Sequence, residues 1–152
     1  MLDFALAHAV HVLSVILWIG GVGFVTLVLI PALGRTEEAT RMARFQELEG
    51  RFAPQARLWV ALAGGSGLWM VWRGDMWSRF ADPQFWWMHA MVVAWLPFAL
   101  MLFVLEPLVL HRRMRDSKDP AGDFRRLRVT HQVLLALSLL AAFGAAAGAH
   151  GF

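Results

Sequence analysis

HAVHVLSVILWIGG, residues 8–21, places two histidines and a tryptophan inside an otherwise apolar run. The run extends from about residue 4 to residue 33, and a helix of roughly 20 apolar residues is long enough to cross a membrane. His8 and His11 are three residues apart, so they share one face of such a helix. A histidine in hydrocarbon costs free energy unless something binds it, and both side chains are therefore candidate ligands.

Three further segments are apolar and long enough to form membrane spans, and they cover residues 54–72, 85–110 and 129–148. Only 16% of the residues are charged, against about a quarter in ordinary soluble domains. Spans that are joined by short connections pack as antiparallel neighbours. We therefore expect an all-α membrane protein with a single domain, residues 1–152, that folds as an antiparallel four-transmembrane-helix bundle.

A separate amphipathic helix is expected over residues 36–52, between the first and second spans. Thr36 is a typical N-cap residue for the start of this helix. Met42, Phe45 and Phe52 recur at helical spacing, which gives the segment one apolar face. We expect the helix to lie on the membrane surface or against the bundle.

Lysine and arginine indicate the orientation of the chain. They are concentrated in the loops of residues 34–53 and 111–128, whereas the loop of residues 73–84 has only Arg73 and Arg79. Loops rich in these residues stay in the cytoplasm. Both termini and the loop 73–84 are therefore expected on the outer, periplasmic side of a bacterial inner membrane. The formal net charge of +3 reflects this orientation, and we do not expect nucleic-acid binding.

Composition limits the cofactors that the chain can hold. It has no cysteine, which excludes disulfides, cysteine-held iron–sulfur clusters and c-type haem attachment. Six histidines remain as candidate ligands. Under the expected topology they form an outer group and an inner group: His8, His11, His89 and His150 lie towards the outer face, and His111 and His131 lie towards the cytoplasm.

The outer histidines predict a haem b site. One haem takes two axial ligands at the same depth on facing helices, and bundle cores commonly hold such cofactors. His11 and His89 meet this condition best, with His8 as the alternative for the first ligand. His111 and His131 are candidates for a second, inner haem.

Three other residues are expected around the outer pair. Arg73 and Arg79 lie just outside it, where their guanidinium groups would pair with the haem propionates. Trp18 lies two turns after His11 on the same stripe of the helix and would pack on the macrocycle.

Two alternatives use the same residues. The outer histidines with Met76, Met88 and Met91 match the ligands of a copper site, because imidazole and thioether groups suit copper. Methionine is also a common filler of hydrophobic cores. The other alternative is a structural subunit whose histidines bind nothing.

The segment from His11 to Gly21 resembles the opening helix of the CopD-like and HemJ-like bacterial membrane proteins, in which a histidine precedes a Trp-x-Gly-Gly element by one to two turns. Trp87-Met88-His89-Ala90 is similar to the start of their third helix. The resemblance implies a four-span protein that binds haem b or, for the CopD-like members, one that takes part in copper uptake or resistance.

HemJ-like members oxidise protoporphyrinogen IX, and the resemblance implies that activity as a further alternative. They usually carry a lysine two residues after the third-helix histidine, where this chain has Met91. The difference weighs against protoporphyrinogen oxidation and leaves the two candidate ligands unchanged.

The sequence thus predicts a membrane haem b protein that transfers electrons between a membrane quinol or porphyrinogen and a redox partner protein. Two axial histidines leave no open coordination position on the iron, which suits electron transfer. Whether the chain is an oxidoreductase with turnover of its own is left open, as is its oligomeric state, a homodimer included.

Overall fold

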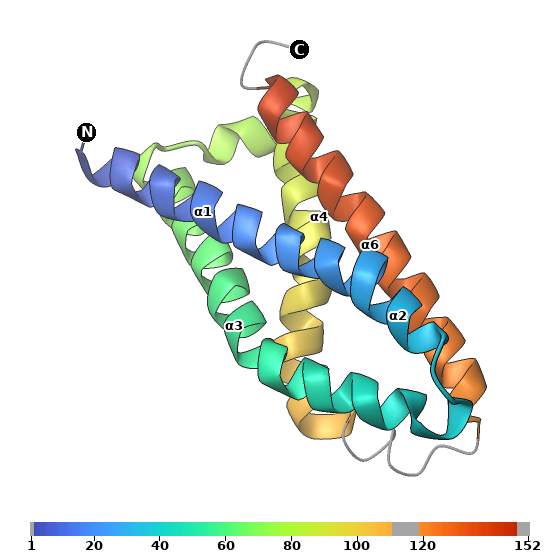
Figure 1. Ribbon diagram of the computed structural model, residues 1–152. Helices are drawn as coiled ribbons and strands as arrows, with labels where there is room; N and C mark the ends of the chain where they lie inside the picture. Colours follow the sequence, from blue (N-terminus) through green and yellow to red (C-terminus); the bar gives the residue numbers. More distant parts are fainter. Residues whose placement is uncertain (1, 111–118, 149–152) are drawn as a thin grey trace.

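The computed structural model describes residues 2–110 and 119–148, and the regular structure within these ranges is helical throughout (Figure 1). His111 and His150 lie outside the described residues. The elements, in chain order, are α1 (Leu2–Phe24), η1 (Val25–Leu29), α2 (Ile30–Gly34), α3 (Glu38–Arg73), η2 (Trp77–Ala81), η3 (Pro83–Phe85), α4 (Trp86–Leu100), η4 (Met101–Leu110) and α6 (Pro120–Gly148).

α1, η1 and α2 form one continuous helical stretch, Leu2–Gly34, in the place of the first predicted span. η1 is a π-helical turn, in which the backbone N–H of Ile30 donates to the carbonyl of Val25. Pro31 follows directly and has no N–H to donate. The wider turn therefore lets the helix continue past the proline.

Three helical stretches are long and apolar enough to cross a membrane, namely Leu2–Gly34, Pro83–Leu105 and Pro120–Gly148. The chain is accordingly a multi-pass membrane protein. The predicted second span, residues 54–72, is not one of these three stretches. Arg57 and the sequence GGSG at residues 64–67 lower its hydropathy. The four-span arrangement and its orientation stay predictions.

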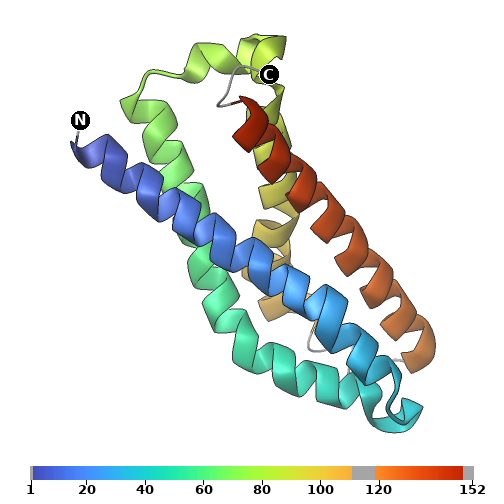
Figure 2. The same cartoon turned by 45° about the horizontal axis from the view of Figure 1, so that its top comes forward.

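α3 corrects the prediction of two separate elements between residues 36 and 72. It is a single helix of 36 residues, with Pro54 inside it. A proline removes one backbone hydrogen bond and bends a helix without having to end it. Figures 1 and 2 show this bend where α3 leaves the lower end of the bundle. The N-cap of α3 is Glu37 and not Thr36, whose hydroxyl instead donates to the carbonyl of Leu33 over 2.7 Å.

The first half of α3 lies against the bundle, which is one of the two positions predicted for the amphipathic segment. The side chain of Phe45 is only 1% exposed. It belongs to a buried cluster with Ile30, Leu33 and Phe124. This cluster joins α2, α3 and α6 at the end of the molecule opposite the start of α1 (Figure 1).

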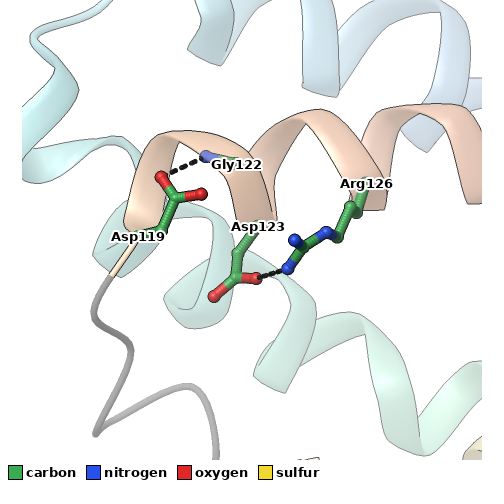
Figure 3. Close-up of polar contacts among 4 residues, drawn as sticks. All are labelled: Asp119, Gly122, Asp123 and Arg126. Carbon is green, nitrogen blue, oxygen red and sulfur yellow. Dashed lines mark hydrogen bonds and ion pairs between the residues drawn. The ribbon is translucent and has the colours of Figure 1, made fainter.

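α6 begins at Pro120, well before the predicted start of the fourth span at residue 129. The carboxylate of Asp119 accepts a hydrogen bond from the N–H of Gly122 over 2.9 Å and caps the helix (Figure 3). Asp123 and Arg126 form an ion pair at 3.0 Å in the same segment. Hydropathy marks only the part of a helix that lies in hydrocarbon, so it could not predict this charged extension.

The helices pack as two pairs, α1 along α3 and α4 along α6. Glycines at these contacts make room for aromatic rings, since Gly21 faces Phe52 and Gly144 faces Trp86. The pairs diverge towards the end where α1 begins, and η2 and η3 bridge them there (Figure 2). Elsewhere the two pairs share a core that contains Trp18, Val60, Phe98 and Leu135.

Candidate functional site

His11 is half-buried on α1 and packs against α3. Its Nδ1 atom lies 2.9 Å from the carbonyl oxygen of Ala63 and 3.2 Å from the hydroxyl oxygen of Ser66. A Cβ atom on Gly67 would lie 3.2 Å from Cε1 of the ring, so the absence of a side chain at this position gives the ring its space. His11 is thus held through Nδ1 inside a helix that is apolar enough to cross a membrane.

The other outer histidines within the described residues, His8 and His89, are exposed on the surface of the molecule. His8 lies one turn before His11 on α1. His89 lies in the first turn of α4, and its ring centroid is 5.3 Å from that of Phe80 in η2. His11 and His89 therefore belong to different helix pairs, and the two pairs diverge towards the end where α1 begins (Figure 2).

Helix contacts indicate the relative depth of these histidines. Gly64, in the part of α3 that contacts His11, faces the ring of Trp95. His89 precedes Trp95 by about 9 Å of helix, in the direction of the outer end. His8 lies about 4.5 Å farther out along α1 than His11. His8 is therefore the nearer of the two α1 histidines to the end at which His89 lies, and the equal depth of His11 and His89 stays a prediction.

Trp18 lies in the core that the two helix pairs share. Its side chain is 6% exposed, and its ring meets that of Phe98 edge to face, with centroids 5.0 Å apart. Its Nε1 is buried and has no hydrogen-bond partner among the residues that the structure describes. The predicted packing of Trp18 on a macrocycle stays untested, and the contact that the structure gives is with α4.

Arg73 and Arg79 lie towards the end of the bundle where α1 begins, which is the predicted outer end, and both already interact within the protein. Arg73 Nε donates to a carboxylate oxygen of Asp3 over 2.9 Å, which ties the start of α1 to the end of α3. The guanidinium group of Arg79 stacks over the ring of Phe85 at 5.0 Å. A propionate would have to compete with these interactions.

His131 is half-buried on α6, towards the opposite end of the bundle. Its Nδ1 atom lies 3.0 Å from the carbonyl oxygen of Leu127, one turn earlier, and its ring meets that of Phe45 edge to face. Its predicted partner in a second haem site, His111, is outside the described residues. The inner pair therefore stays a prediction.

The copper alternative, like the haem site, stays a prediction. Met88 is buried, and Met76 and Met91 are half-buried. Within residues 2–110 and 119–148, no three histidine, cysteine, aspartate or glutamate side chains lie close enough together to hold a metal ion. A haem does not need such a cluster, because the protein supplies only the axial ligands.

The predictions from the sequence omit Arg57, which is half-buried on α3. Its Nε donates to the carbonyl of Leu102 in η4 over 3.2 Å. A signal for this residue was available, since an arginine inside an apolar run is costly and requires a partner. The sequence predictions also omit Ser66. A single serine among glycines gives no signal comparable to that of an arginine.

No protein-family model, no curated protein and no solved structure matches this chain. The resemblance to the CopD-like and HemJ-like proteins therefore stays a prediction that depends on two short motifs.

Proposed function

We propose that this chain is a four-span membrane haem b protein that transfers electrons, with His11 and His89 as the axial ligands. The position of His11 carries the proposal. Its ring lies in an apolar membrane helix and uses Nδ1 to contact the Ala63 carbonyl at 2.9 Å, so Nε2 is the nitrogen left for a ligand. Histidines that bind metals commonly place their other ring nitrogen on a backbone carbonyl in this way.

His89 is the proposed second ligand. It lies on the helix pair opposite His11, and its exposed ring is supported on one side by Phe80. His8 is the alternative to His11, because it shares a helix face with His11 and is nearer to the end at which His89 lies. No hydrogen bond among the described side chains commits His8 or His89 to another role.

Bound haem would supply one-electron chemistry, and two histidine ligands would leave its iron without an open position. The carbonyl of Ala63 would orient the ring of His11, and the ring of Phe80 would support that of His89. We propose a membrane quinol or a porphyrinogen on one side of the electron transfer and a redox partner protein on the other. Met91, in place of the HemJ-like lysine, weighs against protoporphyrinogen turnover.

We further propose that α3 provides the fourth span and that both termini face the periplasm across a bacterial inner membrane. The Asp3–Arg73 ion pair supports this topology, because it brings the start of α1 and the end of α3 to the same end of the bundle. The basic loops of residues 34–53 and 111–128 support the cytoplasmic position of the opposite end.

A reduced-minus-oxidised visible spectrum tests the haem proposal on protein purified in detergent after expression with ample haem. We expect one haem per chain in a pyridine haemochrome assay. The reduced α-band should be lost in His11→Ala and in His89→Ala. His131→Ala should keep it, because His131 lies towards the opposite end of the bundle.

Three outcomes would change the proposal. Loss of the band in His8→Ala together with its retention in His11→Ala would make His8 the first ligand. A second haem that disappears in His131→Ala would establish the inner site. Wild-type protein without haem would overturn the proposal, and copper found in the same preparation by metal analysis would favour copper handling.

A further inference from the structure

We propose that the α3 segment of residues 63–67 is a seat for the His11 ring, which keeps the proton of the neutral imidazole on Nδ1 and leaves Nε2 as the basic, ligating atom. Ser66 and Gly67 are then positioning residues. The assignment of the proton follows from contacts within the protein. Its consequence for iron binding rests on the proposed haem function.

The polar atoms beside Nδ1 both accept hydrogen bonds. The carbonyl oxygen of Ala63, 2.9 Å away, carries no hydrogen. The hydroxyl of Ser66 lies 3.2 Å from Nδ1, and its single hydrogen has two backbone acceptors in α3, the carbonyl of Leu62 and, at 3.3 Å, that of Ala63. A hydrogen donated to either carbonyl leaves an oxygen lone pair for Nδ1. An unprotonated Nδ1 would face the lone pairs of the Ala63 carbonyl however the hydroxyl of Ser66 turns, whereas an Nδ1–H group satisfies both contacts.

The main acceptor is fixed in place. Ala63 is 2% exposed and lies in the middle of α3, so the direction of its carbonyl is set by the helix. A neutral imidazole carries one proton, and the nitrogen without it has the lone pair that binds a metal. With the proton on Nδ1, Nε2 is therefore the ligating atom of His11.

Gly67 supplies the shape of the seat. A Cβ atom at this position would lie 3.2 Å from Cε1 and 3.4 Å from Nδ1 of His11. The first distance is shorter than an ordinary contact between carbon atoms. Alanine at this position would therefore make the ring shift by a few tenths of an ångström, which we expect to weaken its contact with the Ala63 carbonyl. Gly65 differs, because a Cβ atom there would have no neighbour within 4 Å.

The seat has a consequence for a bound iron. A carbonyl that accepts the Nδ1 proton increases the basicity of the other ring nitrogen. A more basic Nε2 donates more strongly and favours ferric over ferrous iron. Weakening the contact with Ala63 should therefore raise the midpoint potential of the haem.

Nitrogen-15 NMR of histidine-labelled protein, prepared without haem and at a pH where imidazole is neutral, tests the proton assignment. The His11 signals are identified by their loss in His11→Gln. We expect the shift of a protonated nitrogen for Nδ1 and that of an unprotonated nitrogen for Nε2. The opposite assignment for His11 would overturn the proposal.

Gly67→Ala tests the seat, and Gly65→Ala is its matched control. Both replace glycine by alanine in the same helix, which favours helix formation, so both variants should fold. We expect a mixture of the two neutral forms of His11 in Gly67→Ala and no change in Gly65→Ala. In haem-loaded protein, Gly67→Ala should raise the midpoint potential and Gly65→Ala should not.

Equal behaviour of the two glycine variants in the NMR experiment would also overturn the seat. Protein that shows Nδ1–H on His11 but binds no haem would overturn the proposed function and leave the seat intact. The two failures are therefore distinguishable.

Discussion

Trp18 and Trp95 lie in the same core but differ in what their indole N–H groups meet. Trp95 Nε1 donates to the carbonyl of Val60 over 2.8 Å. The N–H of Trp18 has no such partner in the part of the chain that the structure describes. An unsatisfied buried donor is costly, so the contact of Trp18 with Phe98 and its neighbours must offset that cost.

Replacing either tryptophan by benzothienylalanine tests this difference, because the analogue keeps the shape of the ring and has sulfur in place of the N–H. At position 95 we expect the free energy of unfolding to fall by about 1 kcal/mol, since a hydrogen bond is lost. At position 18 we expect no decrease. Unfolding in mixed detergent micelles measures both. Equal losses at the two positions would show that the Trp18 N–H has a partner after all.

At the scale of helices, the contact between α3 and η4 explains why an arginine lies in an apolar segment. η4 is π-helical, and its backbone hydrogen bonds join residue i to residue i−5. The donor opposite the carbonyl of Leu102 is therefore residue 107, which is a proline without an N–H. Arg57 supplies the missing donor from α3 at 3.2 Å.

A double-mutant cycle with Arg57→Met and Pro107→Ala tests this account. Pro107→Ala provides a backbone N–H for the Leu102 carbonyl, so the loss of Arg57 should cost less in that background. We expect a coupling free energy of about 1 kcal/mol, the size of one hydrogen bond. Arg57 has a further interaction besides this one, and the cycle separates the two. Strictly additive effects would show that Arg57 and Pro107 are independent.

At the scale of the whole molecule, the proposed topology requires α3 to cross the membrane. The chain has no cysteine, so a single introduced cysteine is the only thiol that a maleimide can label. Ser78 in η2 and Gln46 in the first half of α3 are both exposed and lie on either side of the predicted second span. They are suitable positions for an accessibility test.

We expect Ser78→Cys to react with a membrane-impermeant maleimide in intact spheroplasts. Gln46→Cys should react only after the membrane is opened, because the proposed orientation places the basic loops in the cytoplasm. Labelling of both positions from the same side would show that residues 54–72 do not span the membrane. Labelling of Gln46→Cys alone from outside would reverse the proposed orientation.

The helical fold class and the membrane location follow from the amino-acid sequence. Three helical stretches in the places of three predicted spans are long and apolar enough to cross a membrane, and the regular structure of the described residues is helical as predicted. Apolar length is a sum over neighbouring residues, so it needs no knowledge of packing. The prediction from the sequence divided α3 at Pro54, because a local pattern cannot show that packing keeps a bent helix continuous.

For the candidate site, too, one part could be predicted from the sequence and another part depends on the tertiary structure. The sequence is sufficient to select His11, because a histidine in an apolar run is conspicuous, and to exclude thiolate ligands. The contact of its ring with Ala63, 52 residues away, depends on which faces of α1 and α3 meet. The contact of Arg57 with Leu102, 45 residues away, likewise depends on packing and on the register of a π-helix. Contacts over such separations depend on helix rotation and crossing, and these are properties of the folded molecule rather than of any segment.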